Sequence, residues 1–164
     1  MIVADHSLRT LPEFRIIRED HELLDLLPEE DAQEFASMTV VQGQREWERF
    51  QTEILAGARL ADYALLDRVR KQGYGCSHNV DDLPRSFDKP ALIVTGRQDA
   101  SVGYADAWRI LDNYPRTTFA VLDRAGHNLQ IEQPDLLHAL VSEWLDRIQE
   151  TEHSPIMQIS DSTM

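Results

Sequence analysis

Two loops of this sequence carry residue types that could act together in acid–base chemistry. Asp99 follows the apolar run at 91–96, and His127 follows a second apolar run at 117–122. A carboxylate that accepts a hydrogen bond from one imidazole nitrogen fixes the tautomer of the ring and leaves the other nitrogen free to act as a base. The two residues therefore predict an Asp–His pair, provided that the fold brings their loops together.

Each residue also has an ordinary structural explanation. An aspartate after a strand often caps the next helix, and a Gly–His pair in a loop, here Gly126–His127, is weak evidence alone. The combination is more informative, because parallel strands place the loops at their carboxyl ends along one edge of a sheet. Both explanations stay open at the level of the single residue.

The segments around these loops predict a βαβ unit. Residues 91–96 form a short run with β-branched side chains, which is typical of a strand buried on both faces. Apolar residues at helical spacing over 107–114 predict a helix of about three turns, and 117–122 predict a second strand. A strand–helix–strand unit of this length makes a right-handed crossover between parallel strands. A last helix with one apolar stripe is expected over 134–148.

Residues 1–88 predict helices and no strand. The expected helices start at the leucine cluster 23–27, at Pro28 with continuation through Val41, around Trp47, Phe50 and Ile54 with a break at Gly57, and at Tyr63 with an end at Gly73. Trp47, Phe50 and Tyr63 could line a pocket beneath a lid, but their helical spacing favours a core. We therefore divide the chain into a helical region, 1–88, an α/β portion, 89–150, and a flexible tail, 151–164.

The α/β portion resembles a known family in two stretches. Residues 89–99, Lys-Pro-Ala-Leu-Ile-Val-Thr-Gly-Arg-Gln-Asp, resemble the penultimate strand of the α/β-hydrolase family and its acid-bearing loop. Residues 125–134, Ala-Gly-His-Asn-Leu-Gln-Ile-Glu-Gln-Pro, resemble the histidine loop that leads into the family's last helix. The resemblance implies that Asp99 is the acid and His127 the general base of a triad, in the family's order of serine, acid and histidine.

The same resemblance implies a fold class and a reaction. The fold is α/β, a helical cap followed by the C-terminal βαβα portion of an α/β-hydrolase sheet, and it is incomplete as a domain. The reaction is serine-type hydrolysis of an ester, amide or similar bond in a small-molecule substrate. The helical region 1–88 is similar in position to the cap that many members insert, and we expect neither a cofactor nor a metal.

The family's nucleophile is missing from this sequence. Its serine lies in a G-x-S-x-G elbow, and no such motif occurs among the 164 residues. The nearest match, Gly-Cys-Ser-His-Asn around Ser77, lacks the final glycine and any strand-then-helix context. We therefore expect a C-terminal fragment that is inactive alone. The alternative is a non-catalytic oligomeric binding or assembly module derived from the same fold.

Composition limits the partners. With 29 acidic and 16 basic side chains the net charge is −13, which disfavours nucleic-acid and membrane-surface binding. The one cysteine, Cys76, fits a reducing compartment, and no apolar run is long enough to span a bilayer, so we expect a cytoplasmic protein. Two parallel strands with an open edge predict self-association or pairing with a missing N-terminal half.

One further motif resembles a zinc-binding sequence. His21-Glu22-Leu23-Leu24-Asp25 differs from the zinc motif H-E-x-x-H in its last residue. A charged helix face explains the same residues, so a metal site and a solvated surface are both consistent with the sequence. The remaining histidines, His6, His78, His138 and His153, show no mutual ligand spacing.

Overall fold

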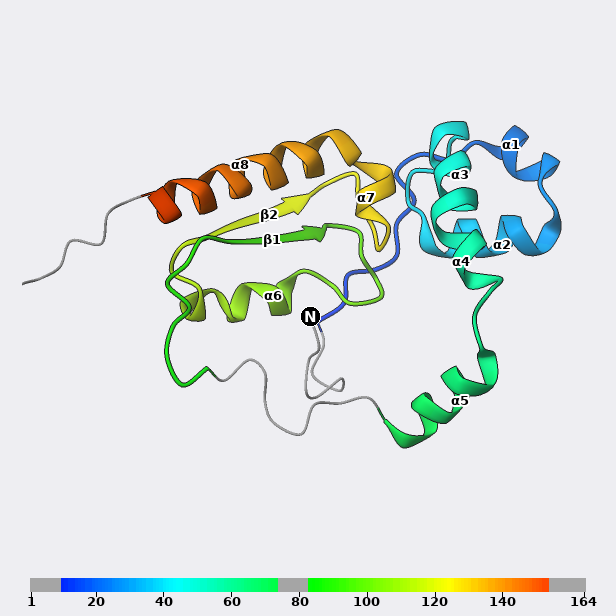
Figure 1. Ribbon diagram of the computed structural model, residues 1–164. Helices are drawn as coiled ribbons and strands as arrows, with labels where there is room; N and C mark the ends of the chain where they lie inside the picture. Colours follow the sequence, from blue (N-terminus) through cyan, green and yellow to red (C-terminus); the bar gives the residue numbers. More distant parts are fainter. Residues whose placement is uncertain (1–9, 74–82, 154–164) are drawn as a thin grey trace, which may run out of the picture.

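The computed structural model describes residues 10–73 and 83–153 (Figure 1). Within these ranges a two-stranded sheet lies between helices, and a group of helices from the N-terminal region lies beyond one end of the strands (Figure 1). The architecture is α/β, with a group of helices followed by a βαβα portion that contains a parallel sheet, as expected from the sequence.

The two strands form where the apolar runs predicted them. Strand β1 covers Ala91–Gly96 and strand β2 covers Thr117–Leu122, and they pair in parallel with Ala91 opposite Thr117 and Gly96 opposite Leu122. Both strands therefore end at the same edge, where their loops carry Asp99 and His127. The backbone N–H of Ala91 donates to Arg116 O over 3.1 Å. Since alternate residues of a strand point their amides to opposite sides, the amides of Leu92 and Val94 face the other edge, with which no described strand pairs.

The crossover helix is shorter than expected. Helix α6 covers only Ala105–Arg109, and a 3₁₀ turn, η3, follows at Leu111–Asn113. The prediction of about three turns was therefore wrong. The residue before a proline disfavours helical backbone, and Tyr114, which precedes Pro115, leaves the helical region with φ −131° and ψ 68°.

The last helix covers one face of the sheet. Helix α8 runs over Pro134–His153, on the opposite side of β1 and β2 from α6 (Figure 1). The indole Nε1 of Trp144 donates to Pro90 O over 3.0 Å, which attaches the helix just before β1. Residues 151–153, the first part of the expected tail, continue this helix, and the rest of the tail lies outside the described residues.

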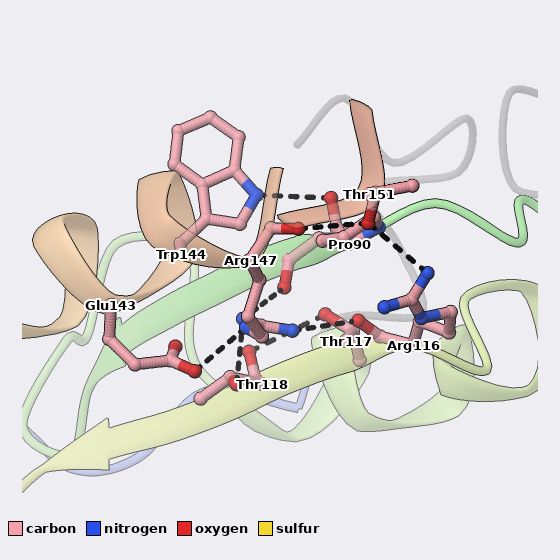
Figure 2. Close-up of polar contacts among 9 residues, drawn as sticks. Pro90, Arg116, Thr117, Thr118, Glu143, Trp144, Arg147 and Thr151 are labelled. Atoms are coloured by element: carbon pink, nitrogen blue, oxygen red, sulfur yellow. Dashed lines mark hydrogen bonds and ion pairs between the residues drawn. The ribbon is translucent and has the colours of Figure 1, made fainter. Parts of the chain in front are cut away.

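One arginine of α8 binds the amino ends of both strands, as Figure 2 shows. The Arg147 guanidinium donates to Arg116 O at 3.1 Å, to Ala91 O at 3.2 Å and to Thr118 Oγ1 at 2.9 Å. Its Nε lies 2.8 Å from Glu143 Oε1, one turn earlier on the helix. A single side chain thus satisfies backbone carbonyls of both strands and fixes the helix on the sheet.

The N-terminal region is helical, and its aromatic residues form a core. The helices are α1 (His21–Leu26), α2 (Glu29–Met38), α3 (Gln44–Phe50) continuing through a π-helical turn η2 (Gln51–Leu55) into α4 (Ala56–Ala58), and α5 (Tyr63–Gln72). Phe35 packs against Trp47 and Phe50 with ring centroids 5.4 and 5.2 Å apart. All three rings are buried, so Trp47 and Phe50 belong to the core. Tyr63 is 64% exposed and belongs neither to the core nor to a pocket, and its hydroxyl donates to Ala58 O.

Two boundaries in this region differ from the prediction. Helix α2 ends at Met38, and Val41 forms an isolated parallel bridge with Arg18 instead of continuing the helix. The cause is the run of β-branched residues 39–41, whose side chains favour extended backbone. Gly57 does not break the third helix, which continues to Ala58, because a single glycine costs a helix only about 1 kcal/mol relative to alanine.

No helix in the ranges 10–73 and 83–153 is long and apolar enough to cross a bilayer.

Candidate functional site

The structure brings Asp99 and His127 together at the carboxyl ends of β1 and β2. Asp99 Oδ2 lies 3.2 Å from His127 Nδ1. With Nδ1 protonated, the ring donates to the carboxylate, and Nε2 is the nitrogen left free to accept a proton. The Asp99 side chain is 7% exposed and the His127 side chain 40% exposed. The acid is thus buried while the base remains accessible.

The loop after β1 holds the Asp99 carboxylate in place. Its other oxygen, Oδ1, accepts the backbone N–H of Ser101 at 2.8 Å and of Val102 at 3.0 Å. Gly103 closes this turn with its N–H donating to Asp99 O, and its φ of +72° is one that residues with a Cβ rarely adopt. These contacts cap the turn at 99–103. They do not cap the next helix, α6, which begins after Tyr104 without a side-chain cap, so the helix-capping interpretation of Asp99 was wrong.

Asp99 and His127 each shift the pKa of the other. Burial raises the pKa of the Asp99 carboxyl, but the hydrogen bonds from His127, Val102 and Ser101 outweigh it and hold the pKa below its ordinary value. The hydrogen bond to Asp99 raises the pKa of His127, burial opposes this, and the negative charges of Asp99 and Glu132 add to the rise. The imidazolium form is stabilised, as an acid–base catalyst that must accept a proton requires.

Close packing between the end of β1 and the histidine loop fixes the distance between the two residues. A Cβ placed on Gly96 would lie 2.3 Å from Gly126 O and 2.5 Å from Ala125 O. Only glycine at this position allows the loop before His127 to pass directly over the end of β1. The backbone N–H of Gln98 then donates to Ala125 O over 2.9 Å, which joins the acid loop to the histidine loop.

A cavity of about 610 Å³ opens beside the pair. Its lining combines one side of β1 and the crossover with the two site residues: Ala91, Leu92, Ile93, Val94, Thr95, Asp99, Val102, Gly103, Ala107, Ile110, Tyr114, His127 and Leu129. The lining is mainly apolar, with a carboxylate and an imidazole at the carboxyl end of the strand. That combination suits a small organic molecule whose reactive bond lies next to His127.

No serine or cysteine is among the described residues that line this cavity. Thr95, which does line it, directs its hydroxyl to Ala120 O at 3.4 Å. Ser77, the nearest sequence match to a nucleophile, lies outside the described residues, as do Cys76, His6 and His78.

The zinc-like motif on α1 does not gather ligands. His21 is exposed and lies 3.4 Å from Glu19, and within 10–73 and 83–153 no group of three or more histidine, cysteine or acidic side chains could hold a metal ion. In the described chain, the sequence around His21 is a charged helix face.

Sequence reasoning missed one residue next to the site. Glu132, in the short helix α7 (Leu129–Glu132), is 4% exposed and contacts the loop before His127 through its carboxylate. The one available signal was an acidic residue beside Leu129 and Ile131, within a stretch that otherwise supplies apolar side chains to the core.

Comparisons with known proteins relate the fold of this chain to solved structures. No protein-family model and no curated protein matches the chain. Among solved structures, the chain is similar to an α/β superfamily hydrolase from Oenococcus oeni PSU-1, with a TM-score of 0.77 and 27% identity over 91% of this chain and 55% of that one. A thermophilic esterase aligns with a TM-score of 0.49 and 18% identity over 85% of this chain and 54% of the esterase.

The chain spans about half the length of the solved structures it matches. What it shares with the hydrolase from Oenococcus oeni is nearly its whole described course, from the N-terminal helices through the parallel strands to the last helix. The chain therefore has the fold of the C-terminal part of the α/β-hydrolase superfamily.

Proposed function

We propose that this chain supplies the acid and the general base of a serine-type α/β-hydrolase. The observation that carries the proposal is the pair itself: a buried carboxylate, held by two backbone amides, lies 3.2 Å from Nδ1 of an accessible histidine beside an apolar cavity. His127 Nε2 takes the proton of the attacking hydroxyl and returns it to the leaving group. Asp99 keeps the ring in the required tautomer and stabilises the imidazolium.

The nucleophile in this proposal is a serine supplied by a second polypeptide. A hydroxyl attacks the carbonyl carbon of an ester or amide of a small-molecule substrate, and the covalent intermediate is then hydrolysed by water. Without the serine the chain is expected to be inactive alone, because the members of a triad act as a unit. The helical region 1–88 is proposed as the cap over the substrate, and the single cysteine favours a cytoplasmic location.

The partner is proposed from the open edge of the sheet. The amides of Leu92 and Val94 point toward the side of β1 with which no described strand pairs, and the same residues line the cavity. A strand from a missing N-terminal half, or from a second copy of the chain, would pair there and cover the apolar surface. A strand from the N-terminal half would also bring its own nucleophile close to His127.

A second candidate function is non-catalytic. The open edge of β1 and an apolar cavity beside it also suit an oligomeric binding or assembly module, in which a second copy fills the groove. In that case the Asp99–His127 pair serves only to fix the two loops. A stable oligomer that shows no turnover, alone or with an N-terminal half, would favour this function.

The experiment measures hydrolysis of a short-chain activated ester by the purified chain, with His127→Ala and a serine-directed covalent probe beside it. The chain alone should give neither turnover nor labelling. The chain mixed with the N-terminal half of a related hydrolase should gain turnover that His127→Ala abolishes. Turnover and labelling by the chain alone would show that the nucleophile lies within it, and turnover that survives His127→Ala would refute the assigned base.

A further inference from the structure

Glu132 binds three backbone amides from two distant segments. Its Oε1 accepts the N–H of Val40 at 2.5 Å and of Val41 at 3.2 Å, and its Oε2 accepts the N–H of Gly126 at 2.5 Å. The side chain is 4% exposed. Val40 and Val41 follow helix α2, whereas Gly126 immediately precedes His127. One buried carboxylate thus joins the end of an N-terminal helix to the loop of the proposed base.

A second contact attaches the other side of His127 to the same segment. The Asn128 side-chain amide donates to Met38 O over 3.4 Å. In addition, Val40 Cγ1 lies 3.0 Å from where a Cβ on Gly126 would stand. His127 is therefore flanked on both sides by residues that bind the chain at 38–41. The strand β2, by contrast, ends at Leu122, five residues before His127.

We propose that Glu132 is a positioning residue that couples the loop of His127 to residues 38–41 at the end of α2. The N-terminal helical region then does more than cover the site, because its own backbone sets where the base stands. This inference rests on the proposed function for its catalytic meaning, while the coupling itself is a property of the fold. A displacement of residues 38–41 would move His127 relative to Asp99.

The charge of Glu132 is part of the coupling. The three backbone amides bind both carboxylate oxygens of Glu132. A glutamine in its place would offer one oxygen, and its NH2 group would face a backbone N–H that is also a donor. Burial raises the pKa of Glu132, the three amides oppose the rise, and the charge of Glu46 adds to it. The Glu132 carboxylate also favours the protonated form of His127. Glu132 therefore acts on His127 in two ways, through its hydrogen bond to the neighbouring backbone and through its negative charge.

Glu46 provides a matched control. It is 8% exposed and, like Glu132, lines the polar cavity of about 460 Å³ that also contains Arg18 and Arg124. It has no hydrogen bond to the loop of His127 among the described contacts. Glu46→Gln therefore removes a comparably buried charge from the same cavity and leaves the coupling intact.

The test is nuclear magnetic resonance on the full chain, with His127 assigned by His127→Ala. In Glu132→Gln we expect the Gly126 and Val40 amide protons to move upfield, because they lose charged acceptors, and the His127 ring to titrate at lower pH. In Glu46→Gln the Gly126 and Val40 amide protons should stay where they are, because their hydrogen bonds to Glu132 remain. An unchanged His127 titration with an unmoved Gly126 amide in Glu132→Gln would overturn the proposal.

A second measurement needs no substitution and covers the case in which Glu132→Gln fails to fold. In the unmodified chain, scalar couplings should be detectable across the hydrogen bonds from the Gly126 and Val40 nitrogens to Glu132 Cδ. Their absence would overturn the coupling. These readouts do not depend on turnover: if they hold while the complemented chain hydrolyses esters without His127, the proposed function fails and the coupling stands.

Discussion

The amino ends and the carboxyl ends of strands β1 and β2 are held by different chemistry. At the amino ends, the Arg147 guanidinium binds the carbonyls of Ala91 and Arg116 (Figure 2), and Trp144 binds Pro90 O. At the carboxyl ends, the loops meet through the Asp99–His127 pair beside an open cavity. The first cluster joins a permanently charged group to backbone acceptors, and the second joins two groups that both titrate.

This difference teaches which end can be altered without loss of the fold. The guanidinium stays charged and the carbonyls stay neutral across the accessible pH range, so the amino-end cluster stabilises the fold at every pH. The Asp99–His127 pair contains two groups whose protonation changes with pH, which is useful for proton transfer and makes its contribution to stability depend on pH. Substitution of Arg147 should therefore change stability alone, and substitution of Asp99 or His127 should change the proposed chemistry.

The largest expected effect is on activity at the carboxyl ends. In the chain complemented by an N-terminal half, Asp99→Asn should lower kcat by about 10⁴-fold, because an amide leaves His127 in the wrong tautomer. The fold should survive, since asparagine Oδ1 still accepts the amides of Ser101 and Val102. Single-turnover ester hydrolysis measures the loss, with the exposed Asp123→Asn as a control that stays within about twofold. Full activity in Asp99→Asn would contradict the assignment of proton transfer to the carboxyl ends of the strands.

The next largest effect is on stability, and it arises where β1 meets the histidine loop. Gly96→Ala should cost about 3 kcal/mol, because its Cβ would overlap the carbonyls of Ala125 and Gly126 and force the backbone apart. Urea unfolding measures the loss. Gly57→Ala, whose Cβ would meet nothing within 4 Å, is the helical control and should instead stabilise by roughly 0.5–1 kcal/mol. Equal effects of the two substitutions would contradict the close packing at Gly96.

A moderate effect is expected at the amino ends. Arg147→Met keeps the apolar stem but removes the guanidinium hydrogen bonds to Arg116 O, Ala91 O and Thr118 Oγ1, so it should cost about 2 kcal/mol in urea unfolding. The His127 titration should not move, because the substitution lies at the other end of the strands. Glu143→Gln, which removes only an exposed ion pair with Arg147, should cost under about 0.5 kcal/mol. A shift of His127 in Arg147→Met would show that the two ends are coupled.

The smallest effect is the pH dependence of stability. Because the folded-state pKa of His127 lies above its ordinary 6.5, pairing stabilises the fold below that pH and is lost as pH rises through the folded-state value. The Asp99 contribution is present above 3.8 and is lost as pH falls through its lowered pKa. Urea unfolding between about pH 5 and pH 9 should show the first loss in the wild type and in Arg147→Met, and a weaker one in Asp99→Asn. Parallel curves for all three chains would contradict the pairing.

Much of the architecture follows from local pattern. Both strands, the helix after Pro28, the helix that ends before Gly73 and the beginning of α8 at Pro134 were predictable, because apolar period and turn residues act over a few positions. The meeting of Asp99 and His127 was also predictable, since it follows from two parallel strands that end at one edge. Their catalytic roles stay a prediction.

Sequence by itself thus determined the elements and the pair, whereas tertiary structure decided how the pair is supported. The exposure of Tyr63 and the pairing of Val41 with Arg18 depend on what packs nearby. The contact between Glu132 and Val40 spans 92 residues, and no spacing rule connects them. The hydrophobic period of a segment predicts which face of a helix or strand is buried. It does not predict which distant backbone amides a buried carboxylate will bind, because those amides come within reach only when the segments pack together.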